Sequence, residues 1–114
     1  MARRRDRVAP PPPKGGWDCR FANNNAATSW EQISATAPNN VRKAWKLITT
    51  DPLRWDKRQQ PLKGRLATAV INHKALPQWQ YEVTGGGRIW YCVDKDTATV
   101  WLTAVHIGHP KATE

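Results

Sequence analysis

The chain of 114 residues is long enough for one domain with a single core, because a domain of this size buries roughly two-thirds of the surface that its unfolded chain exposes. It carries 18 lysines and arginines against 9 aspartates and glutamates, a formal charge of +9, which favours a polyanionic partner. No apolar run approaches the roughly 18 residues that a membrane span needs, and we expect a cytoplasmic protein without a membrane partner.

The positive charge is concentrated in two blocks. Residues 1–16 hold five basic side chains and one acidic one, and residues 41–74 hold nine and two. The first block contains four consecutive prolines and has almost nothing to bury, so we expect a disordered basic tail before a single domain over residues 17–114. Such a tail is either a nucleic-acid-binding arm or a solubilising leader.

The first half of the domain is expected to fold as a strand followed by two helices. Residues 17–21 alternate apolar and polar side chains, which predicts a short strand. The asparagines at 23–25 can cap a helix over residues 26–37. Pro38 ends that helix and opens an amphipathic helix over residues 39–50. The outer side of the second helix carries Arg42, Lys43 and Lys46.

The second half is expected to form an antiparallel meander. Residues 53–77 mix basic and turn-forming residues, which predicts a loop with at most one short strand near residues 64–70. Alternating patterns and the turns between them predict strands over 78–84, 88–94 and 97–106. The predicted fold class is therefore α+β, in the order β-α-α-β-β-β, with a helical hairpin packed on a small antiparallel sheet.

Three stretches in this order carry a resemblance to a known family. They are Arg58-Gln59-Gln60-Pro61-Leu62-Lys63-Gly64, then Arg88-Ile89-Trp90-Tyr91-Cys92-Val93-Asp94, then Val100 to Val105 followed by His106 and His109. Over residues 17–111 the chain resembles the RelE/ParE superfamily of bacterial toxins. The resemblance implies a RelE-like fold and the toxin of a toxin–antitoxin pair. Most branches cut mRNA on the ribosome and so inhibit translation, and a minority branch poisons DNA gyrase.

The resemblance also implies partners, namely a cognate antitoxin, the ribosome and mRNA. Because the chain is basic, we expect an acidic antitoxin segment that covers residues 41–74 and Arg88. No metal and no cofactor are expected, because RNA can be cleaved through its own 2′-hydroxyl with a base, an acid and cations alone. Cys19 and Cys92, the two cysteines, lack the spacing of zinc ligands.

The chemistry of this cleavage and the resemblance select the candidate site residues. The candidate catalytic residues are His109, Arg88, Lys63, His106 and Glu82. The candidate nucleic-acid-binding residues are Arg42, Lys43, Lys46, Arg58, Arg65 and Lys111. Histidine can act as base or acid at cellular pH, and arginine can hold a phosphate with two parallel hydrogen bonds. Arg88 and His109 are expected at the sheet edge, where they would converge on one phosphate.

Each candidate also has an interpretation without function. A histidine at a strand end or on the surface is common, and Glu82 could simply form an ion pair with Arg88 across the hairpin. Trp90 lies on the same face as Arg88, so it either offers a stacking surface to a base or packs in the core. Trp55, in the basic loop, is expected to be exposed.

Two departures from the family pattern keep a second interpretation open. Glu82 or Thr84 stands where the family has an arginine before the glycine turn, and the chain lacks a terminal tyrosine. The alternative is a non-enzymatic relative, either a gyrase poison or a nucleic-acid-binding protein without catalysis.

Overall fold

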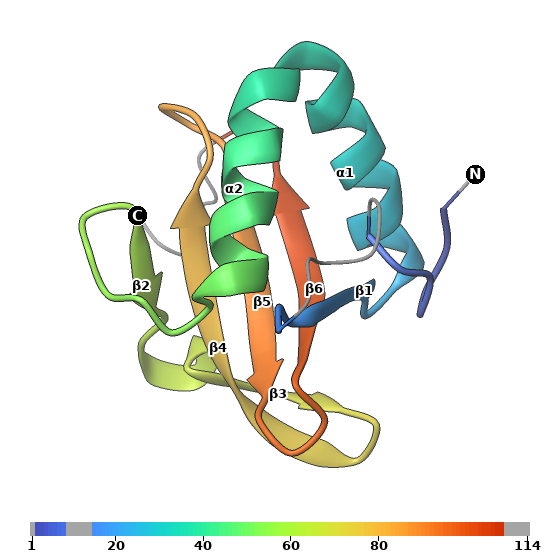
Figure 1. Ribbon diagram of the computed structural model, residues 1–114, viewed down its shortest axis with the longest axis vertical. Coiled ribbons are helices and arrows are strands. Elements are labelled where there is room, and N and C mark those ends of the chain that lie inside the picture. Colours follow the sequence, from blue (N-terminus) through green and yellow to red (C-terminus); the bar gives the residue numbers. More distant parts are fainter. Residues whose placement is uncertain (1, 9–14, 109–114) are drawn as a thin grey trace.

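The computed structural model describes residues 2–8 and 15–108. Two helices pack against one face of a mixed six-stranded sheet, so the fold class is α+β (Figure 1). Within the described part of the chain, no helix is long and apolar enough to cross a membrane.

The elements follow the predicted order, with two additional strands between the helices and the meander. In chain order they are β1 (Asp18–Phe21), α1 (Asn24–Thr36), α2 (Pro38–Thr50), β2 (Gln59–Pro61), the 3-10 helix η1 (Gly64–Leu66), β3 (Thr68–Ile71), β4 (Lys74–Glu82), β5 (Arg88–Asp94) and β6 (Thr99–His106). The strand order in space is β1-β6-β5-β4-β2, and β3 pairs with β4 outside that path. Both helices and the antiparallel meander of β4, β5 and β6 are confirmed.

Two parts of the sheet differ from the prediction. The sheet is mixed and not antiparallel, because β1 runs parallel to β6 with Phe21 opposite Leu102. The region predicted as a loop with at most one strand holds β2, η1 and β3, and β4 begins at Lys74 and not at residue 78. These short strands are formed by pairing with the long β4, which is a tertiary effect that local alternation does not reveal.

The helices begin where the sequence predicts. The side chain of Asn23 accepts a hydrogen bond from the backbone N–H of Ala26 at 2.7 Å, which caps α1. The Asn23 amide also donates to the backbone carbonyl of Thr103 at 2.9 Å, and this bond joins the start of α1 to β6. Pro38 occupies the first turn of α2, where a missing N–H costs no helical hydrogen bond.

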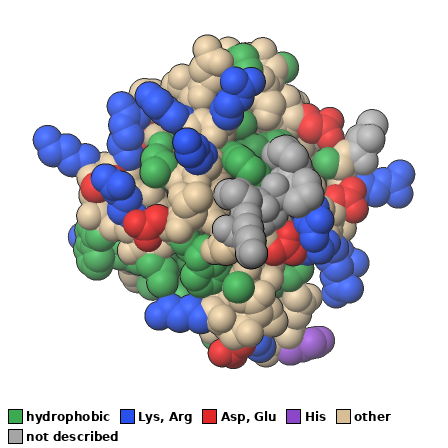
Figure 2. Space-filling view, viewed as in Figure 1, with side chains coloured by type: hydrophobic (Ala, Val, Ile, Leu, Met, Phe, Trp, Pro, Cys, Tyr) green, Lys and Arg blue, Asp and Glu red, His purple; other side chains and the backbone are tan. Residues whose placement is uncertain are grey.

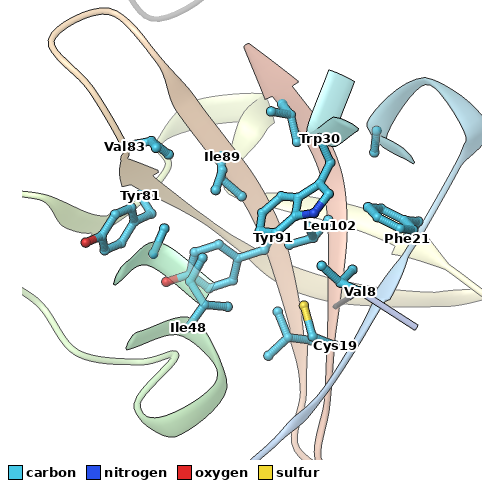
Figure 3. Packing of buried hydrophobic residues seen from close by; sticks show 14 of the residues in the cluster. Val8, Cys19, Phe21, Trp30, Ile48, Tyr81, Val83, Ile89, Tyr91 and Leu102 are labelled. Carbon is cyan, nitrogen blue, oxygen red and sulfur yellow. The ribbon is translucent and has the colours of Figure 1, made fainter. Parts of the chain in front are cut away.

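The core lies between the helices and the sheet. Figure 3 shows side chains from both helices and from β4, β5 and β6 meeting there, among them Trp30, Ile48, Tyr81, Ile89, Tyr91 and Leu102. The buried hydroxyl of Tyr91 donates to the carbonyl of Pro52 at 2.8 Å and accepts from the Gln59 amide at 2.9 Å. These bonds join β5 to the end of α2 and to β2. Burial raises the pKa of the Tyr91 hydroxyl.

Part of the predicted tail packs against the domain. Val8 is 1% exposed and belongs to the core cluster (Figure 3). Its N–H donates to the carbonyl of Cys19 at 2.8 Å, and its own carbonyl accepts from the Trp45 indole at 3.2 Å. The expectation that residues 1–16 have almost nothing to bury therefore does not hold for Val8. A single valine among arginines gives no periodic pattern, so its burial could not be predicted from the sequence. The segment packs here because the edge of β1 offers free backbone groups.

Candidate functional site

Three of the candidate catalytic residues form one row across the sheet. Arg88 on β5 lies opposite Glu82 on β4 and opposite His106 on β6. Their neighbours in each strand belong to the core cluster, so the row lies on the face turned away from the helices, which we call the open face. The open face also includes Gln78, Gln80, Trp90, Trp101 and Thr103.

Arg88 is held by the glycine turn between β4 and β5. Its Nη1 donates to the carbonyls of Thr84 at 3.1 Å, Gly85 at 3.4 Å and Gly87 at 3.0 Å. The side chain is 9% exposed, which differs from the accessible edge position expected for it. Within the described residues these bonds use Nη1 alone, so Nε and Nη2 keep donors for another partner.

The predicted ion pair between Glu82 and Arg88 is absent. The two residues lie opposite each other as expected, yet no ion pair joins them in the described chain. The guanidinium turns toward the turn carbonyls instead, because three neutral acceptors converge there. Glu82 is half-buried at the β4 end of the row, and its carboxylate is not paired with Arg88.

His106 has the environment of a neutral imidazole. It is half-buried, and burial lowers the pKa of the ring below its ordinary value of 6.5. The ring contacts the indole of Trp90, with 4.5 Å between the ring centroids. Its buried Nε2 has no hydrogen-bond partner among the described residues. A neutral imidazole with an unpaired nitrogen can accept a proton near neutral pH.

Trp90 belongs to the open face and lies outside the core cluster, but it is buried, with 8% of its surface exposed. Its indole N–H donates to the Gln80 side chain at 2.9 Å, and Thr103 donates to the Gln78 side chain farther along the same face. The pairing of β5 with β6 shifts by one residue between Trp90 and Tyr91. Alternation places Trp90 on the face of Arg88, whereas Gln78, Gln80 and Thr103 were not selected from the sequence.

Lys63 and Arg65 lie at the other end of the open face. Both side chains are exposed, next to and within η1, and the carbonyl of Leu66 in η1 accepts from the Gln78 amide at 2.8 Å. Gln78 and Glu82 are four residues apart on β4, about 13 Å at the rise of an extended strand. Lys63 and Arg65 therefore do not lie in the row of Arg88.

The basic residues of α2 lie in the other layer of the fold. Arg42, Lys43 and Lys46 are exposed on α2, and Figure 2 shows lysines and arginines gathered over that helix. Lys43 also lines a groove of about 280 Å³ with Arg58 and Tyr81, between α2 and the sheet. The three residues of α2 are separated from Arg88 by the core, so the candidates fall into two surfaces. Arg58 lies between them, because its carbonyl accepts from the N–H of Glu82 at 2.7 Å.

Two candidates, His109 and Lys111, lie outside the described residues. The expected convergence of Arg88 and His109 stays a prediction for that reason. Within the described chain, no group of three His, Cys, Asp or Glu side chains could hold a metal ion. Cys19 and Cys92 are both free and buried, and burial raises the pKa of the Cys92 thiol to about 12.

The row of Glu82, Arg88 and His106 combines a carboxylate, a guanidinium and a neutral imidazole beside an indole. These groups can accept a proton, stabilise a phosphate and contact a base. No protein-family profile, curated protein or solved structure was found to match this chain.

Proposed function

We propose that the chain is the toxin of a toxin–antitoxin pair with a RelE-like fold, and that it cuts mRNA on the ribosome. The single observation that supports this best is the row of Glu82, Arg88 and His106 on one sheet face. These residues were selected from the sequence for RNA chemistry, and strand register brings them side by side. The resemblance to the RelE/ParE superfamily supplies the reaction.

In this proposal the chemical step on the ribosome uses side chains of this chain and the 2′-hydroxyl of the RNA, without a metal ion. The 2′-oxygen attacks the adjacent phosphorus, the bond from phosphorus to the 5′-oxygen breaks, and a 2′,3′-cyclic phosphate forms. His106 takes the proton of the 2′-hydroxyl, because its lowered pKa keeps the imidazole neutral and its Nε2 has no partner among the described residues. His109 gives a proton to the leaving 5′-oxygen, and Arg88 stabilises the charge on the phosphate. Glu82 is the alternative base.

The basic surface of α2 and Arg58 is the proposed contact for the ribosome or for the acidic antitoxin. Because α2 and Arg88 lie in different layers of the fold, an antitoxin segment that reaches both must pass around an edge of the sheet. The groove shared by Lys43 and Arg58 is the better place for a short acidic segment.

One observation favours the non-enzymatic alternative, either a gyrase poison or a nucleic-acid-binding protein. The Arg88 guanidinium is buried and already makes three hydrogen bonds to the glycine turn. These bonds give Arg88 a structural role in the glycine turn that does not depend on contact with RNA.

The proposal is tested by inducing the chain in growing cells and mapping transcript ends. We expect cuts within translated codons for the wild type and for Lys95→Ala, an exposed residue in the turn at the far end of β5. His106→Ala should lower cleavage by about 100-fold or more, the scale of a positioned acid or base. DNA damage without transcript cleavage would favour the gyrase alternative, and full cleavage by His106→Ala would remove this residue from the mechanism.

A further inference from the structure

A pair of hollows lies on the open face at the edge formed by β1 and β6, away from the row of Arg88. The larger hollow, of about 410 Å³, is lined by Arg5, Arg20, Asn72, His73 and Trp101. The smaller one, of about 200 Å³, shares Arg5, Asn72 and Trp101 and adds Arg4. Because they share these residues, the two hollows form one site, which we call the Trp101 site.

The Trp101 site is assembled from four separate segments of the chain. Arg20 on β1 lies beside Trp101 in the strand register. Arg5 from the N-terminal segment donates from Nη2 to the side-chain oxygen of Asn72 at 3.3 Å, in the turn between β3 and β4. The carbonyl of Arg5 accepts from Arg20 Nη1 at 3.0 Å. The site is therefore fixed by hydrogen bonds before any ligand arrives.

The backbone at this site adopts a conformation that non-glycine residues rarely take. Arg5 has φ 71°, Asn72 has φ 51° and His73 has φ 69°. Positive φ at both Asn72 and His73 is what the two-residue hairpin turn between β3 and β4 requires. Arg5 has no such turn to explain its backbone, and unfavourable conformations of this kind are concentrated at binding sites in proteins.

The charge of the Trp101 site suits an anion. Arg20 is paired with Asp18 at 2.7 Å, whereas Arg4 and Arg5 form no ion pair within the described residues. Both of these arginines are exposed, and among the described residues none that lines the two hollows is acidic. A phosphate placed here would meet two guanidinium groups whose charge is not neutralised.

The aromatic floor distinguishes a nucleotide from other anions. Trp101 is partly exposed and lines both hollows, so its ring is accessible to a planar group. A base that stacks on tryptophan, with its phosphate on nearby arginines, is the usual contact of single-stranded nucleic acid. The larger hollow has a volume within the range of about 300–1,000 Å³ of small-ligand pockets.

We propose that the Trp101 site binds one nucleotide of single-stranded RNA, with the base on Trp101 and the phosphate on Arg4 and Arg5. The choice of RNA rests on the proposed function, whereas the charge and the aromatic floor do not. Trp101 and His106 lie on the same face of β6, because the register with β5 shifts between them. Their partners Cys92 and Arg88 are four positions apart on β5, about 13 Å at the rise of a strand. One RNA strand can therefore reach both sites. The nucleotide on Trp101 then lies outside the position of the phosphate that is cleaved.

The test measures binding of the full chain to a fluorescein-labelled uridine hexanucleotide by anisotropy, without ribosomes and without cleavage. We expect Trp101→Ala to weaken binding by about 5-fold or more, the effect of losing one stacked base. Trp55→Ala is the matched control, because Trp55 is 70% exposed but lies in another loop. Trp101→Phe keeps a stacking ring and should retain most of the affinity, even if the alanine variant folds poorly.

The phosphate contact is tested by salt dependence. Arg5→Gln should lower the slope of log affinity against log salt by about 1, and Arg3→Gln, an exposed arginine that lines neither hollow, should leave it unchanged. Equal binding by Trp101→Ala and Trp55→Ala would overturn the proposal. Competition by inorganic phosphate or hexaglutamate as strong as that by uridine monophosphate would also overturn it. A chain that binds RNA in this way but never cleaves it would contradict only the proposed function.

Discussion

The imidazole of His106 lies against the indole of Trp90, with 4.5 Å between the ring centroids and 66° between the ring planes. The indole is fixed in turn by its hydrogen bond to Gln80. The indole therefore excludes water from one side of the imidazole. This burial lowers the pKa of His106.

The pH dependence of stability follows from this burial. Below about pH 6.5 the unfolded chain binds a proton at His106 more readily than the folded chain does, so the free energy of unfolding should fall as the pH drops. Urea unfolding between pH 7.5 and pH 5 should show a larger loss for the wild type than for His106→Gln, whose side chain does not titrate. Equal losses would mean that His106 titrates alike in the folded and unfolded chains.

Replacing Arg88 by lysine should destabilise the protein. The lysine side chain ends one bond before the position of Nη1, so its ammonium does not reach the carbonyls of Thr84, Gly85 and Gly87 together, and losing this charged donor should cost about 1–3 kcal/mol. Urea unfolding measures this loss, and Arg42→Lys on the exposed side of α2 is the matched control. If Arg88→Lys is as stable as the control, the three bonds do not contribute to stability.

The glycine turn offers a pair of substitutions that differ only in the available space. A Cβ at Gly87 would lie 2.7 Å from Thr84 Oγ1 and 3.1 Å from Ile33 Cδ1, whereas a Cβ at Gly85 would meet nothing within 4 Å. Thermal unfolding should show Gly87→Ala destabilised by about 1–3 kcal/mol. Gly85→Ala should remain within about 0.5 kcal/mol of the wild type. The reverse order would show that the turn is packed differently.

The N-terminal segment is expected to contribute to stability through Val8. Val8→Ala removes two buried methyl groups and should lower the free energy of unfolding by about 1–3 kcal/mol. Arg3→Ala, an exposed position in the same segment, should change it by less than about 0.5 kcal/mol. Chemical denaturation of the three proteins side by side gives the comparison. An unchanged Val8→Ala would mean that the segment does not pack on β1 in solution.

The parts of this protein that could be predicted from the sequence are those with local signals. The cap at Asn23, the break at Pro38 and the alternation around Arg88 and Trp90 each depend on neighbours in the chain. Trp55 was expected to be exposed, and it is. Strand alternation also predicts which side of β5 carries Arg88.

The Trp101 site could not be predicted, because its residues meet only through tertiary pairing. Nothing local to Arg20 indicates that it lies beside Trp101, since their strands are separated by most of the chain. The short strand at 59–61 was missed for the same reason, and the one at 68–71 was expected only as a possible short strand near residues 64–70, as each is completed by β4. His73 lies in the region predicted as a loop, and only the turn between β3 and β4 places it at the site.

The parallel pairing of β1 with β6 has a consequence for how the chain acquires its fold during synthesis. Asp18 and Thr99 are partners in the sheet, so β1 cannot be paired until nearly all of the described chain has left the ribosome. Contacts between residues so far apart carry a large loop-closure entropy and slow folding. The two helices can form early, whereas the sheet edge with the Trp101 site is completed last. The surface proposed to bind RNA is thus absent until β6 has been made and can pair with β1.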